Sequence, residues 1–325
     1  MKHAHGARAR ELAARLTTYR DKTGWSQQQF AQRLNWPTQK CVQIETGQWS
    51  PSELDVAMYL AECGVPPLDR AALLELVDGD RHGCWVRPHG DRLPDAAPGV
   101  LFQHQTAEQI TCYHPTEIPV ILQDNGYINE DLRHRFGTDE AIARHEFPRC
   151  EYRWILHSDT PPEVTCFLHE SVLRAVPFDE DDRWELYNDL TVYIESKQTE
   201  VRIIPADRED ALRVPEFSLL RSAGRSPVVC RPCETVTLIL EGDHIAAYEP
   251  YVALLDELAL STLESRDLIV EIAGGQEAIA FPPTSTIEDL ARDGEVWEPG
   301  FITEAMAAVQ AKREAEAQES KAESK

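Results

Sequence analysis

Long hydrophobic runs are missing from this sequence. No stretch of its 325 residues approaches the roughly eighteen consecutive apolar side chains that a membrane-spanning helix needs. The first residues, MKHAHGARARELAARL, lack the apolar core of a secretory signal, so we expect a cytoplasmic protein. With 42% hydrophobic and 27% charged residues, the chain is long enough for two compact domains, each with its own core.

Complete motifs for disulfide frameworks, catalysis or metal binding are also absent. The eight cysteines are spread over a long chain, so we expect reduced thiols. Cys230 and Cys233 form a single C-x-x-C that lacks a second pair and does not open a helix. His82, Cys84 and His89 likewise lack paired ligand spacing, and no G-x-S-x-G, P-loop or H-E-x-x-H is present. We therefore expect no enzyme, no metal and no cofactor; redox or metal chemistry at Cys230 and Cys233 remains the less favoured alternative.

Positive charge is scarce, and its distribution is uneven. The formal net charge is -24, yet residues 1–50 hold eight Lys or Arg against three Asp or Glu, while the rest of the chain holds 24 against 53. Phosphates respond to charge within roughly a Debye length, about 8 to 10 Å in ordinary salt. Only the N-terminal segment therefore suits a polyanion.

This segment begins with the pattern of two helices and a tight turn. A first amphipathic helix is indicated by apolar residues at helical spacing: Leu12, Leu16 and Tyr19. Ser26 is a suitable N-cap for a second helix, with Gln29 at the capping-box position and Phe30 on the apolar face. The second helix is expected to stop at Asn35, one of the few residue types other than glycine that tolerates the left-handed conformation of a tight turn.

Three more helices follow within the first eighty residues. Pro37 fits the start of the third helix, in which Cys41 and Ile44 are expected to point inward, and Gly47 ends it. A fourth helix is predicted after Ser50-Pro51-Ser52 and a fifth over residues 68–77. In the fourth helix, three residues are expected to face inward: Leu54, Met58 and Leu60.

The pattern resembles the Cro/cI-like, or XRE-type, helix-turn-helix family. The resemblance is carried by Ser26-Gln27, Phe30-Ala31, Leu34, Asn35-Trp36, Ile44-Glu45, Gly47 and Pro51. It implies that the third helix enters the major groove of DNA with its N-terminal end first. With Cys41 and Ile44 inward, the side chains left to read base edges are Thr38, Gln39, Lys40, Val42 and Gln43. Gln27 resembles the family's phosphate-contacting residue. A solvated, Gln-rich helix face is the plainer alternative for any one of these residues.

Beyond this segment the composition and the hydrophobic pattern of the sequence change twice. Residues 81–110 are rich in Gly, Pro and charge without sustained periodicity, which predicts a linker. Residues 111–275 then alternate strand-like and helical stretches, which predicts an α+β domain. The expected strands are 163–169, 201–204, 217–220, 227–229 and 235–240, and the expected helices include 127–136, 184–194 and 250–260.

This second region resembles the C-terminal domain of unknown function of WhiJ-like, antitoxin-like transcriptional regulators in filamentous, spore-forming bacteria. The resemblance spans residues 111–273 and rests on the order of several short motifs: Tyr113 with Pro115, Ile118-Pro119, Leu122-Gln123, Tyr127, Glu170, Leu173-Arg174, 201–205, Phe217 and 258–265. His114 stands where that family usually has an acid. The resemblance implies a regulator, often encoded with a small partner protein, and no enzymatic activity.

The sequence therefore predicts an all-α, five-helix helix-turn-helix domain over residues 1–80, an α+β regulatory or partner-binding domain, and an extension with a charged tail over 276–325. The predicted function is a dimeric, sequence-specific DNA-binding transcriptional regulator. An antitoxin-like module that mainly binds a small protein is the alternative. The operator, the direction of regulation and the ligand or partner are not encoded in any motif.

Overall fold

The computed structural model describes residues 6–77, 83–89, 93, 99–175, 180–196 and 198–274. The predicted extension and tail over 276–325 lie outside the described residues, as does His82. Within the described part of the chain, no helix is both long and apolar enough to cross a membrane.

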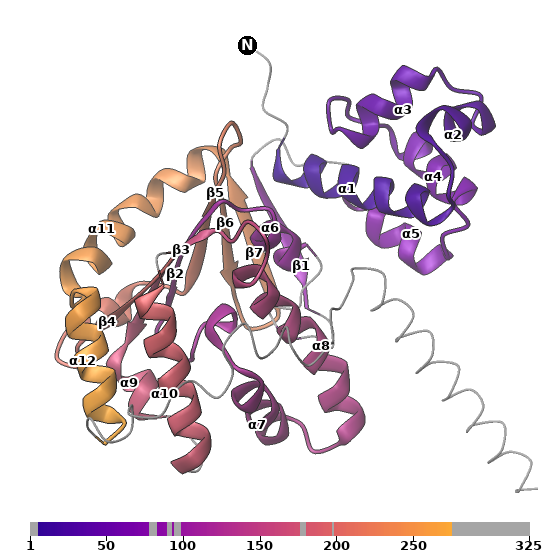
Figure 1. Cartoon of the computed structure of the whole chain (residues 1–325). Helices are drawn as coiled ribbons and strands as arrows, with labels where there is room; N and C mark the ends of the chain where they lie inside the picture. The colour runs from indigo at the N-terminus through magenta and orange to yellow at the C-terminus, as the bar shows by residue number, and fades with distance from the viewer. Residues whose placement is uncertain are drawn as a thin grey trace, which may run out of the picture. The chain divides into compact units, whose positions relative to one another are not determined.

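The N-terminal part consists of the five helices predicted from the sequence (Figure 1). They are α1 (Ala7–Lys22), α2 (Gln27–Arg33), α3 (Thr38–Glu45), α4 (Glu53–Glu62) and α5 (Pro67–Leu74). Their apolar faces share one core, in which Leu16, Phe30 and Tyr59 are fully buried.

Local signals in the sequence determine how α2 and α3 are joined. The Ser26 side chain accepts from the backbone N–H of Gln29, and the Gln29 side chain accepts from the Ser26 N–H, which completes the expected capping box. Asn35 adopts φ 54° and is the only non-glycine residue of the described chain with positive φ. The predicted left-handed turn between the helices is thus confirmed.

The inward face of α4 differs from the one expected. Leu60 is fully buried, as predicted, but Leu54 is 69% exposed and Met58 is 39% exposed. Val56 and Tyr59 are buried with Leu60 instead, at spacings of three and four residues that place all three on one face. Apolar composition alone did not determine the phase of this helix, because each turn of α4 offers more than one apolar residue.

The second part is built on a seven-stranded mixed sheet in the order β1-β7-β6-β5-β2-β3-β4. The strands are β1 (Cys84–Pro88), β2 (Gln109–His114), β3 (Glu163–His169), β4 (Thr199–Ile204), β5 (Phe217–Arg221), β6 (Val228–Pro232) and β7 (Val236–Glu241). β2, β3 and β4 pair in parallel, and every other pair is antiparallel. The strands expected from the sequence correspond to β3–β7, and the predicted α+β class is confirmed.

Helices link the parallel strands and cover the sheet (Figure 1). Between β2 and β3 lie η1 (Val120–Leu122), α7 (Asn125–Arg135) and α8 (Asp139–Leu156), and between β3 and β4 lie α9 (Glu170–Arg174) and α10 (Glu180–Glu195). The remaining elements are α6 (Val100–Gln105), η2 (Glu209–Arg213), η3 (Gly242–Ala247), α11 (Glu249–Leu258) and α12 (Thr262–Ile272). Parallel neighbours require such crossover connections, whereas the antiparallel strands β5, β6 and β7 follow one another through short turns.

Side-chain alternation divides the core between the two faces of the sheet. Along β2, Ile110 and Cys112 belong to the core beneath α8, α10 and α12, while Tyr113 belongs to the core on the opposite face with η3 and α11. Both faces are covered, so the central strands carry apolar residues on both sides, such as Leu219 and Leu220 on β5.

The described part of residues 81–110, predicted as a linker, includes β1, α6 and the first two residues of β2. β1 forms an edge of the sheet by pairing with β7, with Cys84 opposite Leu240 and Pro88 opposite Val236. α6 follows, and its Val100 is buried in the core. A five-residue strand and a six-residue helix are too short to show periodicity, so long-range pairing is what reveals them.

Candidate functional site

The outer face of α3 is open to solvent at the end that the sequence assigns to DNA. Thr38 and Gln39 are exposed, and Val42 and Gln43 are partly exposed. The inward anchors are confirmed, because Cys41 is fully buried and Ile44 is 2% exposed. The side chains of Thr38 and Gln39 can therefore meet a surface outside the protein without rearrangement of the helix.

Lys40 is used within the protein itself. Its Nζ lies 2.6 Å from Oδ1 of Asp55 on α4 and 4.1 Å from the centre of the Trp36 ring. These two contacts hold the ammonium beside the start of α4. A base or phosphate contact by Lys40 would have to compete with Asp55, so base reading by Lys40 stays a prediction.

Glu45, the last residue of α3, is a buried carboxylate that contacts side chains of α1, α2 and α4. It is 8% exposed and accepts hydrogen bonds from Nε and NH2 of Arg20 at 2.8 and 2.9 Å. The Tyr59 hydroxyl donates at 2.6 Å and the Cys41 thiol at 3.2 Å. Burial alone would raise the pKa of Glu45. Hydrogen bonds from Arg20, Tyr59, Gln27 and Cys41 instead lower it below its usual value.

Gln27 joins this cluster from the first turn of α2. Its Nε2 donates to Oε2 of Glu45 at 2.9 Å, so the first residue of α2 is tied to the last residue of α3. This contact fixes the two helices relative to each other. It also orients the Gln27 amide, whose proposed contact with phosphate stays a prediction.

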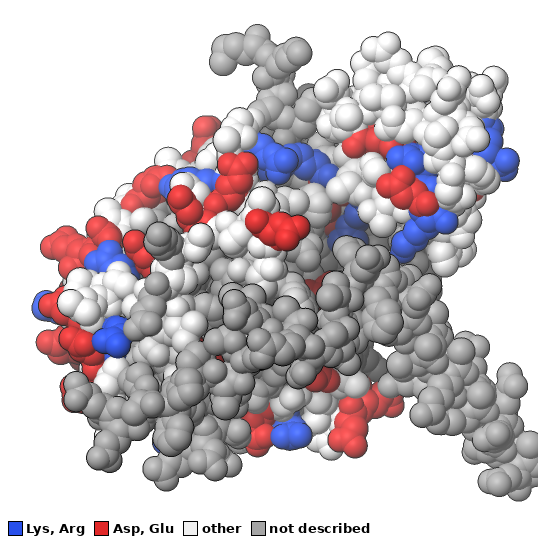
Figure 2. Space-filling model, viewed as in Figure 1, with Lys and Arg blue, Asp and Glu red and all other residues white. Residues whose placement is uncertain are grey.

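The surface around α3 carries little charge, in contrast to α11 and α12. Figure 2 shows mostly uncharged atoms over α3 and acidic atoms along the side that α11 and α12 form. Those two helices carry six acidic residues, Glu249, Asp256, Glu257, Glu264, Asp267 and Glu271, against the single basic residue Arg266. A polyanion is therefore repelled more strongly from α11 and α12 than from the surface around α3.

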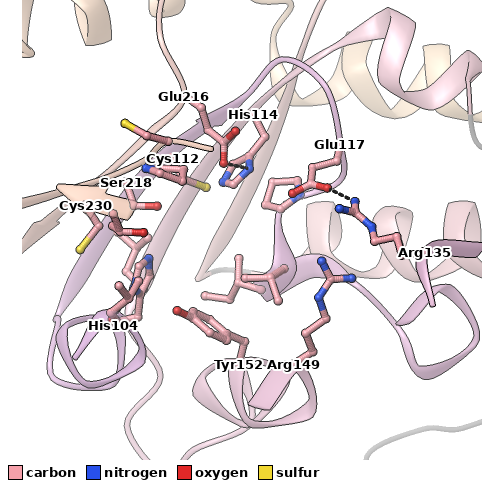
Figure 3. Close-up of a pocket in the computed structure, with 18 residues that line it drawn as sticks. His104, Cys112, His114, Glu117, Arg135, Arg149, Tyr152, Glu216, Ser218 and Cys230 are labelled. Carbon is pink, nitrogen blue, oxygen red and sulfur yellow. Dashed lines mark hydrogen bonds and ion pairs between the residues drawn. The ribbon is translucent and has the colours of Figure 1, made fainter. Parts of the chain in front are cut away.

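A cavity of about 280 Å³ lies on the face of the sheet that α6 and α8 cover (Figure 3). Its floor includes Cys112, Ser218 and Cys230, which pair directly across β2, β5 and β6, and Cys166 on β3 extends this row. Val201 and Ile239 continue this row at its two ends. Because the residues in the middle are small, the helices cannot close down on the sheet there, and His104 and Tyr152 line the opposite wall (Figure 3).

The antiparallel register of β2 and β5 brings two ionisable groups together at the mouth of this cavity. Tyr113 pairs with Phe217, so the next step along each chain sets His114 beside Glu216. His114 Nδ1 lies 3.1 Å from Oε1 of Glu216 but has no hydrogen bond of good geometry, so we treat the contact as an ion pair. Burial would lower the pKa of His114, whereas the charge of Glu216 raises it well above its usual value.

Two arginines that line the cavity, Arg135 and Arg149, form a charged wall with the two carboxylates that they pair with. Arg135 pairs with Glu117 at 2.5 Å and with Asp131 at 2.8 Å. Arg149, which is only 2% exposed, pairs with the same Asp131 at 2.6 Å. Figure 3 shows Arg135 and Arg149 facing the cavity from the side of Glu117. The four opposite charges balance one another, so this wall does not attract an anion by excess charge.

Both C-x-x-C cysteines line the cavity, and the surroundings of Cys230 do not activate its thiol. Cys230 is buried in β6, and burial, followed by the charge of Glu11, raises the pKa of its thiol far above the usual value. A protonated thiol is a poor nucleophile and a poor metal ligand. Cys84 and His89 lie on or beside β1, where His89 contacts the Thr237 hydroxyl at 2.9 Å. They belong to no group of three potential metal ligands among the described residues.

The cavity and its ionisable residues could not be found from spacing in the sequence. His114 was noticed only as an unusual residue for its position, and Glu117 and Glu216 carried no motif. Glu216 lies about a hundred residues from the other two, so only the pairing of β2 with β5 brings it near them. β2, the strand that ends at His114, is not among the strands predicted from the sequence, so it gave no signal for this site.

Comparison with known proteins agrees with this architecture. Residues 11–73 match a helix-turn-helix domain. Residues 103–271, slightly more than half of the chain, match a domain of unknown function, DUF5753. No curated protein matches the sequence. The predicted organisation, a helix-turn-helix domain followed by a domain of unknown function, is confirmed, and the chain belongs to the DUF5753 family, with a helix-turn-helix domain at its N-terminal end.

Proposed function

We propose that this protein is a sequence-specific, DNA-binding transcriptional regulator that reads bases with α3. The observation that carries the proposal is the outward position of Thr38 and Gln39 at the N-terminal end of a helix anchored by Cys41 and Ile44. In helix-turn-helix proteins this end of the second helix contacts base edges in the major groove. Gln can pair with adenine N6 and N7, and the Thr methyl can contact the thymine methyl.

Replacing Gln39 with alanine is expected to weaken binding to the operator by about 1 to 3 kcal/mol, with little effect on random DNA, because a base contact distinguishes sequences. The operator is first identified by genome-wide mapping of bound DNA. Affinities for both DNAs are then measured over a series of salt concentrations. The logarithm of the affinity should fall linearly with the logarithm of salt for either protein, and the slope should be unchanged because Gln39 is uncharged.

Gln198→Ala, a change at an exposed glutamine in the second part of the chain, is the matched control and should leave both affinities unaltered. Equal losses by Gln39→Ala on operator and random DNA would remove Gln39 from the base-reading set. Binding that does not respond to salt would count against DNA recognition as a whole.

Homodimerisation is part of the same proposal. Helix-turn-helix dimers place their recognition helices about 34 Å apart, so that both reach the major groove on one side of the duplex.

We propose that the second part of the chain senses a small molecule and has no enzymatic role. The cavity beneath α6 and α8 supports a binding function of this kind.

The second candidate function is an antitoxin-like module that binds a small protein encoded nearby. The acidic residues of α11 and α12 favour a basic partner. Co-purification from the native host separates the two candidates. Recovery of self-oligomers alone would count against the antitoxin-like module and leave the DNA-binding regulator. Recovery of a small protein in stoichiometric amount would support the antitoxin-like module.

A further inference from the structure

The three potential metal ligands at the mouth of the cavity come from separate places in the chain. His114 ends β2, Glu117 lies in the loop that follows, and Glu216 directly precedes β5. One ligand atom from each lies within 4.8 Å of the others, and the structure of the described residues holds no other such group. We propose that His114, Glu117 and Glu216 bind a divalent transition-metal cation of the Zn²⁺ class.

The spacing of these atoms fits one ion with small movements. Zn²⁺ binds imidazole nitrogen and carboxylate oxygen at about 2.0 to 2.2 Å, so neighbouring ligands of a tetrahedral ion lie roughly 3.3 Å apart. His114 Nδ1 and the Glu216 carboxylate are already 3.1 Å apart. Glu117 has to approach by an ångström or so, which a rotation of its side chain in a loop can supply.

Charge balance also permits a cation. Glu117 and Glu216 together offset the two positive charges of the ion, and His114 becomes a neutral donor by releasing its ring proton when the metal binds. Arg135 competes for Glu117 in the metal-free protein, but it also pairs with Asp131 at 2.8 Å. Arg135 therefore keeps a carboxylate partner when Glu117 turns to the metal.

The chemistry of the donors selects the class of ion. Imidazole and carboxylate ligands suit Zn²⁺, Mn²⁺ and Fe²⁺, whereas Ca²⁺ and Mg²⁺ prefer oxygen ligands alone. Three protein ligands leave at least one coordination position vacant, as in metal sites that also bind an outside molecule. Since all three residues line the 280 Å³ cavity, a small molecule bound there could complete the coordination.

The interior of the cavity places a thiol near the imidazole. Cys112 lies two residues before His114 on the same face of β2, and both side chains line the cavity (Figure 3). The Cys112 thiol in turn lies 2.9 Å from that of Cys166. In known metal sites, loss of a hydrogen-bond partner of a ligating histidine reduces metal affinity by about 10- to 100-fold.

The test is Zn²⁺ binding by the full-length protein after removal of metal with a chelator. Equilibrium dialysis with metal analysis gives the stoichiometry and affinity, and thermal unfolding with and without Zn²⁺ gives a second readout. The native chain should bind one Zn²⁺ that Glu216→Gln abolishes or weakens by about 100-fold or more, since a direct ligand matters at least as much as its supporting partner. Glu200→Gln, an exposed change on β4, is the matched control and should bind as the native chain does.

Imidazoles elsewhere, such as His3 and His5, can also bind Zn²⁺, so only binding that depends on Glu216 counts in favour. If Glu216→Gln does not fold, Glu117→Gln provides the same comparison, because its side chain is one-third exposed in a loop. The proposal would be overturned if the native chain and these variants bind Zn²⁺ equally, or if the native chain binds Zn²⁺ only with a dissociation constant weaker than micromolar. The cluster would then be an ion pair alone. Mg²⁺ should not displace the bound Zn²⁺.

Discussion

Replacing Glu45 with alanine is expected to destabilise the five-helix part of the protein by about 3 to 5 kcal/mol, the cost of removing one partner from a buried ion pair. Glu45 accepts from Arg20, Tyr59, Gln27 and Cys41, and it is the buried carboxylate that pairs with Arg20. The variant leaves the Arg20 guanidinium, whose side chain is 9% exposed, with the exposed Asp21 as its remaining carboxylate partner. Hydrogen exchange of peptides that cover α2 and α3 measures the loss locally.

The control for Glu45 is a surface ion pair in the same domain. Arg33 pairs with Glu62, and the Arg33 side chain is 51% exposed, so Glu62→Ala should cost no more than about 1 kcal/mol. A similar, small loss for Glu45→Ala would show that the buried cluster does not hold the helices together. Operator binding should fall with Glu45→Ala because α2 and α3 lose their common partner.

Acid should reduce the difference between the native chain and Glu45→Ala. The pKa of Glu45 is lowered in the folded protein, so its stabilising contribution is complete above about pH 4.5 and is lost as the pH falls through the lower, folded value. Unfolding free energies measured from pH 7 downward should therefore converge in the acid range. A constant difference between the two proteins would contradict the assigned ion pair.

The second large effect on stability is expected for one of two leucines on α4. Leu60→Ala is expected to cost about 2 to 5 kcal/mol, because Leu60 is fully buried and its removal leaves a cavity in the core. Leu54→Ala, the same change on the same helix, is expected to stay within about 0.5 kcal/mol, since Leu54 is 69% exposed. Denaturant unfolding of both variants, with exchange of the α4 peptide, provides the comparison.

This pair tests the helical phase of α4 directly. The sequence favoured an inward position for both leucines, whereas the structure buries only Leu60. Equal, large losses for both variants would support the phase expected from the sequence. Helix propensity does not distinguish them, because each change replaces leucine by alanine inside the same helix.

The turn between α2 and α3 was predictable because its causes are local. Ser26 and Gln29 cap each other within a single turn, and Asn35 reverses the chain by its own backbone conformation. Such signals act over a few residues and are read without knowledge of the rest of the fold. The outward position of Gln39 follows from the same local geometry once Cys41 and Ile44 are buried.

Several elements of the second part were not predicted from the sequence, because they depend on contacts between distant segments. α8 runs from Asp139 to Leu156 and contains Pro148 within the helix, a residue that normally indicates a helix end. β1 is five residues long, lies in a Gly- and Pro-rich stretch, and is defined by its pairing with β7. In both cases distant contacts outweigh the local preference, and a reading of local pattern cannot include them.

The sequence by itself determined the class of each part, the five helices, the capped turn before α3 and the strands β3–β7, because periodicity and capping are properties of neighbouring residues. Only the tertiary structure decided which face of α4 is buried, where β1 belongs, and that His114 and Glu117 meet Glu216 beside a cavity. Those features depend on strand register and on small residues in adjacent strands, such as Cys112 and Ser218, lying in one row. Register is a relation between segments far apart in the chain, and it forms only when the sheet does.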